Sequence, residues 1–180
     1  MSFEDILNNG KLWAVVYDGQ DLNILSKTFA DWRNQDYLKS FFTDNKEDLF
    51  RYFRITNIDA AIFDTIVDTS CLSALILDKS PEANLDELFR PLENKRSLEM
   101  VLSREKAKGK RTSGHASWLR LYAIKLNPGI YVITGGAIKL TQLMSERKHT
   151  LAELQTIDKV RNYLAENGIF DIDGLKEYLS

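Results

Sequence analysis

The feature that most constrains the fold is a pair of apolar stretches joined by a turn sequence in the second half of the chain. Residues 118–126 are mostly apolar and aromatic, Asn127-Pro128-Gly129 has the composition of a turn, and residues 130–134 resume the apolar run. Such a pattern is typical of an antiparallel hairpin. The Gly135-Gly136 pair that follows predicts a bulge or sharp bend before residues 137–141.

Much of the remaining chain has the spacing of amphipathic helices. Apolar residues recur at helical intervals through most of residues 21–77 and again through residues 150–164. Three shorter segments are also predicted to be helical, namely a helix that begins at residues 2–5 and ends at Asn9-Gly10, and residues 85–89 and 93–106. The spacing of Thr150 and Glu153 predicts that the threonine is an N-cap and the glutamate its capping-box partner.

These elements predict an α+β fold, with a small antiparallel sheet flanked by helices and an N-terminal helical cluster inserted after the first strand. The apolar run at residues 12–17 is the expected first strand, and it could join the same sheet. We therefore expect residues 1–180 to form a single domain with three parts. Residues 18–92 are mainly helical and acidic, residues 93–149 are basic and contain the sheet, and residues 150–180 form the C-terminal helices.

Charge is distributed very unevenly along this chain of net charge −2. Residues 1–92 contain 9 Lys/Arg and 16 Asp/Glu (net −7), residues 93–149 contain 12 and 4 (net +8), and residues 150–180 contain 3 and 6 (net −3). A concentrated positive segment predicts a negatively charged partner, either nucleic acid or an acidic protein face. The alternative is that the acidic and basic parts neutralise each other within the fold.

Several classes of protein are disfavoured by what the sequence lacks. Cys71 is the only cysteine, so an intramolecular disulfide and a multi-cysteine zinc site are excluded. His115 and His149 have no metal-ligand spacing, and no phosphate-loop pattern surrounds Gly135-Gly136. We therefore expect no metal and no cofactor. An acidic N-terminus and the lack of a long uninterrupted apolar stretch predict a cytoplasmic protein without a membrane partner.

The strand at residues 118–126 carries the strongest candidates for a site. Period-two alternation places Arg120 and Tyr122 on one face, opposite the more apolar set of Leu119, Leu121 and Ala123. If that face is open, the guanidinium could bind a phosphate and the ring could stack on a base. The alternative is a surface arginine packed over an aromatic neighbour.

Two other residue types in the basic segment could contribute. Lys139, beyond the two glycines, could neutralise a phosphate or a developing negative charge. It could equally be a solvated edge-strand lysine that opposes aggregation. His115 is a candidate acid or base near neutral pH, although it lies in a polar loop far in sequence from His149.

The order of elements from Trp118 through Thr141, followed by the helix from Thr150, resembles the end of a HigB/RelE-type toxin. In that family an arginine-bearing strand, a hairpin, a second strand ending near lysines and a helix occur in this order. The resemblance covers residues 92–167, with the first strand matching more loosely, and is closest to larger bacterial relatives of these toxins. It implies an antiparallel sheet flanked by helices and metal-independent cleavage of mRNA on the ribosome. Arg120, Tyr122 and Lys139 occupy the matching catalytic positions.

This chain departs from the family pattern in size and charge, because such toxins are usually shorter and strongly basic. The acidic helical insertion at about residues 31–87 has no counterpart in the family. It could cover the basic surface as an antitoxin would, or it could replace nuclease function with another binding role.

Our leading hypothesis is a toxin-like, RNA-directed protein, with RNA or the ribosome and an antitoxin-like protein as partners. Further RNA contacts are then expected from the cations and the histidine around the sheet, namely Lys108, Lys110, Arg111, His115, Arg147 and Lys148. The second hypothesis is a non-catalytic binding module whose basic segment holds an acidic protein partner. An unrelated metabolic enzyme is the third, and no motif supports it.

Overall fold

The computed structural model describes residues 1–77, 84–92, 101–109 and 114–180. The strands in this part of the chain are β1 (Ser2–Asp5), β2 (Leu12–Val16), β3 (Phe89–Pro91), β4 (Ser103–Lys108), β5 (Leu119–Asn127) and β6 (Ile130–Ile138). They form one sheet in the order β1-β2-β6-β5-β4-β3. The predicted α+β class is confirmed. The sheet is mixed and not purely antiparallel, because β2 joins β6 in parallel.

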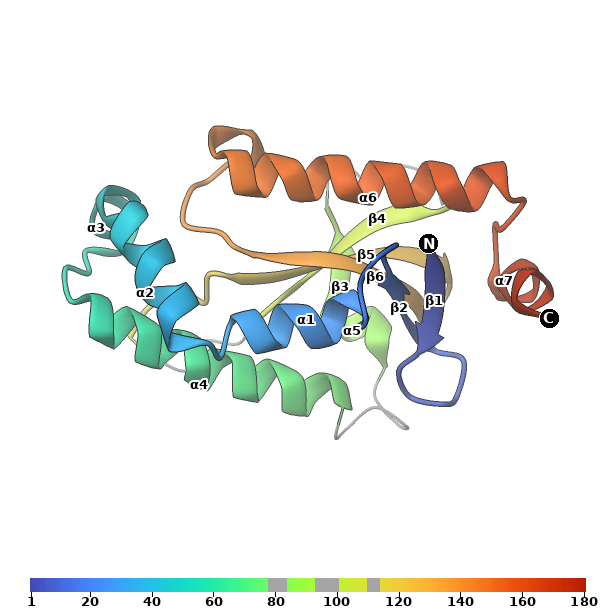
Figure 1. Cartoon of the computed structure of the whole chain (residues 1–180), viewed down its shortest axis with the longest axis horizontal. Helices are drawn as coiled ribbons and strands as arrows, with labels where there is room; N and C mark the ends of the chain where they lie inside the picture. The colour runs from blue at the N-terminus through green and yellow to red at the C-terminus, as the bar shows by residue number, and fades with distance from the viewer. Residues whose placement is uncertain (78–83, 93–100, 110–113) are drawn as a thin grey trace.

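The helices are α1 (Ile24–Asp31), α2 (Gln35–Asp44), α3 (Lys46–Phe53), α4 (Ile58–Leu77), α5 (Leu85–Leu88), the 3₁₀ turn η1 (Met144–Glu146), α6 (Lys148–Glu166) and α7 (Ile172–Leu179). Helices α1 and α4 lie along one face of the sheet and α6 crosses the other, so the molecule has three layers (Figure 1). We call these two sides the α1/α4 face and the α6 face. The predicted N-terminal helical cluster is thus confirmed, and it forms one outer layer.

The predicted hairpin is confirmed as β5 and β6, and so is the bulge near the two glycines. Tyr122 lies opposite Gly135 and Ala123 opposite Ile133, so Thr134 is the extra residue of the bulge. The strand continues through both glycines to Ile138. Gly136 is needed where α1 approaches, because a Cβ atom there would lie 2.7 Å from Cγ2 of Thr28.

Two segments predicted to be helical are strands. Residues 2–5 form β1, in which Phe3 is buried against the α6 face and pairs with Val15; an isolated helical turn is unstable, whereas a sheet edge supplies backbone partners. Residues 103–106, predicted as the end of a helix, belong to β4. In β4 the buried Glu105 and Ala107 alternate with charged residues, a period-two pattern that the charges concealed. Residues 93–100 of that predicted helix lie outside the described residues.

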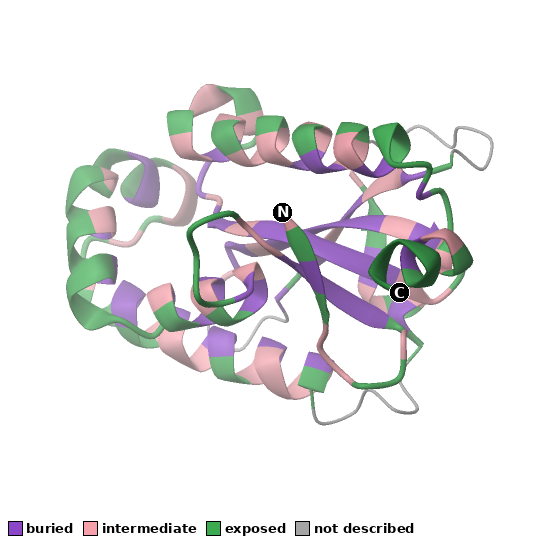
Figure 2. Ribbon diagram, turned by 45° about the vertical axis from the view of Figure 1, so that its right-hand side comes forward, coloured by how far each residue is buried: buried purple, intermediate pink, exposed green. Residues whose placement is uncertain are grey.

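The core is divided by the sheet into two clusters, and the central strands β2, β5 and β6 between them are mostly buried (Figure 2). On the α1/α4 face, Leu119 and Leu121 pack among residues of the helical cluster. On the α6 face, Ile124 packs with Ile157 and Val160 of α6. The expectation that the Tyr122 face of β5 is open is therefore wrong, because α6 covers it.

Helix α4 is the one described helix that is long and apolar enough to cross a membrane, with a mean hydropathy of 1.7 and 39% of that stretch buried. Its polar residues explain its place in the fold. Thr65 is fully buried and accepts a 2.9 Å hydrogen bond from the indole of Trp118 on the sheet, and Asp68 is buried as well. These contacts identify α4 as a core helix of the domain.

Candidate functional site

The sheet register gathers positive charge on the α6 face. Across β4 and β5, Lys108 lies opposite Arg120 and Lys106 lies opposite Tyr122, and directly opposed residues project from the same face of a sheet. Lys139 follows the end of β6, where its backbone amide donates to the carbonyl of Trp118. We call Lys106, Lys108, Arg120 and Lys139 the cationic cluster. The structure thus brings three sequence-predicted residues together and adds Lys106, which the predicted helix had hidden.

This cluster differs from the other cations of the basic segment in its partners. Among the described residues, none of its four cations forms an ion pair with an acidic side chain. Their hydrogen bonds go to backbone carbonyls instead. Lys106 donates to Leu92 at 3.0 Å, Arg120 to Ser117 and Leu119 at 2.8 Å each, and Lys139 to Gln142. Lys106, Arg120 and Lys139 are thus held in place by carbonyl groups, and no acid of the described residues pairs with them or with Lys108.

Other cations of the basic segment are paired with the acidic parts of the chain. Arg104 pairs with Asp158 and Lys125 with Asp86, each at 2.8 Å. Arg147 makes a bidentate contact with Asp48, with Nε–Oδ2 at 2.6 Å and Nη2–Oδ1 at 2.5 Å. Internal neutralisation is therefore confirmed for these three pairs. Arg147, which was predicted to contact RNA, has its guanidinium occupied by Asp48.

Burial and repulsion between the cations lower the pKa values of the lysines in the cluster. Burial lowers the pKa of Lys139, and the charges of Arg120, Lys106 and Lys108 lower it further, against a weaker opposing effect of Glu146. Burial and neighbouring cluster charges likewise lower the pKa values of Lys106 and Lys108. An anion bound among these side chains would relieve that repulsion.

Tyr122 lies within the site but cannot stack on a base, because the residue is only 1% exposed. Its hydroxyl is buried and has no hydrogen-bond partner in the described part of the chain. Burial raises its pKa strongly; the charge of Arg120 acts in the opposite direction, and that of Glu153 adds to the increase. The ring therefore contributes packing, and its hydroxyl feels the charges of an arginine and of a carboxyl group.

That carboxyl group belongs to Glu153, which the predicted capping role did not assign to the site. The N-cap of α6 is Arg147, and the Thr150 hydroxyl donates to the carbonyls of Met144 and Arg147, so the predicted capping box is wrong. The Glu153 side chain instead lies against Gly135, where a Cβ atom would be 2.0 Å from its Oε2. The absence of a side chain at Gly135 provides the space for this carboxyl group.

The environment of Glu153 is unusual for a carboxyl group. Its Oε2 atom is buried without a partner among the described residues. Burial raises the pKa of Glu153 to about 7, against a smaller lowering effect from the backbone amide of Gly136. A sequence signal for its inward position exists. Glu153 precedes Ile157, Val160 and Leu164 at intervals of four, three and four residues, so it shares their buried stripe.

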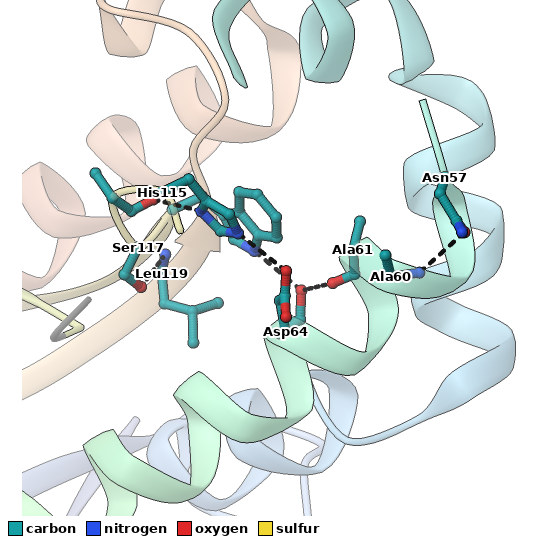
Figure 3. Close-up of polar contacts among 10 residues, drawn as sticks. Asn57, Ala60, Ala61, Asp64, His115, Ser117 and Leu119 are labelled. Atoms are coloured by element: carbon teal, nitrogen blue, oxygen red, sulfur yellow. Dashed lines mark hydrogen bonds and ion pairs between the residues drawn. The ribbon is translucent and has the colours of Figure 1, made fainter. Parts of the chain in front are cut away.

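Two of the remaining predicted RNA contacts, His115 and Lys148, do not join this cluster. His115 lies with the helical cluster, where its Nε2 is 3.1 Å from Asp64 Oδ2 and its ring stacks on Trp118 with centroids 4.1 Å apart (Figure 3). Lys148 is exposed at the first residue of α6. Lys110 and Arg111 lie outside the described residues. Within the described ranges, no group of three or more His, Cys, Asp and Glu residues could hold a metal ion.

The chain was compared with family models, curated proteins and solved structures. No family model matches the chain, and neither a curated protein nor a solved structure is significantly similar to it.

Proposed function

We propose that this chain is a toxin-like, RNA-directed protein of the HigB/RelE type, which acts in the cytoplasm on RNA or on ribosome-bound mRNA and cleaves it without metal. The observation that carries the proposal is the cationic cluster itself. Four cations converge on one face of the sheet, and no acidic side chain in the described residues pairs with any of them. Such an arrangement is suited to the phosphates of a polyanion.

The chemistry of the cluster favours a phosphodiester over a carboxylate-rich protein surface. Within the described residues Arg120 donates to the carbonyls of Ser117 and Leu119 through Nη1 alone, so its other guanidinium nitrogens remain for a phosphate oxygen. The lysines lie on both sides of it across the sheet and could contact the neighbouring phosphates. Next to them are a tyrosine and a carboxyl group, which an acid–base reaction can use and which simple charge attraction does not require.

The acidic helical insertion supports the same proposal through the residues that it does engage. Asp48 of α3 holds Arg147, and Asp86 of α5 holds Lys125. These acids neutralise cations outside the cluster, and no acid in the described part of the insertion pairs with the cluster. In this proposal the insertion supports the fold around the site and does not replace an antitoxin.

Induced expression in a bacterial host tests the proposal. Wild type is expected to arrest growth and fragment mRNA, whereas Arg120→Ala should abolish both because it removes the central phosphate ligand. Lys159→Ala is the matched control, since it removes an exposed cation of α6 outside the cluster and should behave like wild type. Harmless expression of wild type with intact mRNA would overturn the nuclease proposal; an acidic protein recovered in a salt-sensitive complex would then favour the binding-module alternative.

A further inference from the structure

We propose that two copies of this chain associate through the outer face of α4, with the two α4 helices side by side and antiparallel. This surface is distinct from the cationic cluster, because α4 covers one face of the sheet and the cluster lies on the other (Figure 1). Association through α4 would therefore not involve the cluster of either copy.

Helix α4 has two apolar stripes on opposite sides. The inner stripe is buried in the domain and includes Ala61, Leu72 and Ile76. The outer stripe consists of residues that recur at alternating intervals of three and four and are all exposed or half-buried, namely Ala60, Phe63, Val67, Ser70, Ala74 and Leu77. Such intervals define the a and d positions of a heptad repeat, which form the seam where one helix packs along another. We call these six residues the outer seam.

The outer seam has the composition of a contact surface. Its two largest side chains, Phe63 and Leu77, are 67% and 41% exposed. None of its positions is charged, and Ser70 is its one polar residue. Single apolar residues are common on protein surfaces, whereas a continuous apolar row points to a binding partner. The seam therefore requires a partner of matching shape, and α4 of a second copy provides one.

An antiparallel pair of α4 helices places large side chains against small ones. When the two-fold axis passes midway between Val67 and Ser70, each a position faces a d position of the second copy. The three facing layers, each present twice, are Ala60 with Leu77, Phe63 with Ala74, and Val67 with Ser70. One register satisfies all three layers, and alternation of large and small residues across facing positions lets side chains interdigitate. A parallel pair would instead place Phe63 against Phe63 and Ala60 against Ala60.

The charges of α4 favour the same direction. Its three acids, Asp59, Asp64 and Asp68, all lie in the first half of the helix, and residues 69–77 are uncharged. In a parallel pair the two acidic halves would lie together and repel each other. In an antiparallel pair, the acidic half of each helix lies beside the uncharged half of the other. Like-charge repulsion thus selects the direction that the side-chain sizes also favour.

The size of the seam predicts a reversible dimer. It extends along most of the 20-residue helix, which at 1.5 Å per residue is about 30 Å long and with its side chains about 10 Å wide. A standard stable interface buries about 800 Å² on each partner, which is more than one such helix pair supplies. We therefore expect a dissociation constant in the micromolar range and not a permanent complex.

Sedimentation equilibrium of wild type, Ser70→Glu and Ser40→Glu between about 1 µM and about 1 mM tests the association. The mass of wild type should rise with concentration from 20.7 kDa toward twice that value. Ser70→Glu places an unpaired carboxylate at the centre of the seam and should raise the dissociation constant at least about tenfold. Ser40→Glu is the matched control, because Ser40 is an exposed serine of α2 outside the seam. It should associate like wild type, and both variants should unfold in urea at the midpoint of monomeric wild type.

Cross-linking tests the direction of the two helices. In a Cys71→Ser background, equal amounts of Ala60→Cys chains and Leu77→Cys chains are mixed and oxidised. The antiparallel register predicts disulfides between the two kinds of chain, because positions 60 and 77 face each other. Disulfides between chains of the same kind would overturn the antiparallel register.

Three results would overturn a dimer at this face. The first is wild type that stays at 20.7 kDa throughout the concentration range. The second is association of Ser70→Glu that matches wild type, which would place the interface elsewhere. The third is binding of monomeric wild type to phosphatidylcholine vesicles that is lost in Ser70→Glu, which would assign the outer seam to a membrane surface.

Discussion

The two faces of the sheet differ in the hydrogen bonding of a tyrosine and a nearby carboxyl group. On the α1/α4 face, the Tyr131 hydroxyl donates to Asp86 at 2.5 Å, and Lys125 pairs with the same carboxylate. Burial alone would raise the pKa of Asp86, but these hydrogen bonds outweigh it and the pKa lies below its usual range. On the α6 face, Tyr122 and Glu153 have buried oxygen atoms without partners in the described residues, and the pKa of the glutamate rises to about 7.

In our proposal, this contrast separates structural polar groups from groups kept for a ligand. Both faces bury a tyrosine beside a carboxyl group and cations, so composition does not distinguish them. What differs is pairing at these positions. In the described residues the hydroxyl of Tyr131 is hydrogen-bonded to Asp86, whereas the hydroxyl of Tyr122 and Oε2 of Glu153 have no partner. Unpaired groups reduce stability, and function is the common reason that a fold retains them.

The largest stability effect is expected where a paired cation is removed. Arg147→Met leaves Asp48, which is 5% exposed, without its bidentate partner. Loss of the arginine should destabilise the fold, because the Asp48 carboxylate stays buried without its partner. Urea unfolding should show this decrease, and the double variant with Asp48→Asn should recover much of it. A loss as large in Lys108→Met would contradict the distinction between paired cations and the cationic cluster.

A smaller effect compares the two tyrosines with the same substitution. Tyr131→Phe removes the hydroxyl that donates to Asp86 and should lower the free energy of unfolding by about 1–2 kcal/mol. Tyr122→Phe removes a hydroxyl that has no partner in the described residues, so it should be neutral or stabilising by up to about 1 kcal/mol. Thermal unfolding of both variants at pH 7 measures the difference. Equal destabilisation would mean that the Tyr122 hydroxyl is satisfied in solution.

An element of the fold could be predicted from the sequence only where a local pattern of residues identified it. The β5–β6 hairpin and its bulge were predictable because turn residues and apolar runs are adjacent in the chain. Strand β4 was missed because its buried positions include Glu105 and its exposed positions are lysines and arginines, which resemble a solvated helix. The α+β class was still predicted correctly, because the helices around the sheet have a strong helical periodicity of apolar residues.

The candidate site was predicted less completely, for a different physical reason. Arg120, Lys108 and Lys139 were identified from charge and alternation, and the register of β4 and β5 brings the first two into direct opposition. The burial of Tyr122 depends on α6, whose position over the sheet is a tertiary property that alternation cannot reveal. Glu153 fits both a capping box and the buried stripe of α6. Only the packing against Gly135 decides between them.

The most direct test of the central claim is the salt dependence of binding to a short single-stranded 2′-deoxy analogue of RNA. Wild type should lose affinity steeply as salt increases, because each phosphate neutralised releases counterions. Lys108→Met should reduce the slope of log affinity against log salt by about 0.7, which corresponds to one phosphate contact on a single strand. The same substitution at Lys159 should leave the slope unchanged. Equal slopes for wild type, Lys108→Met and Lys159→Met would contradict the claim that the cationic cluster is the surface that holds RNA.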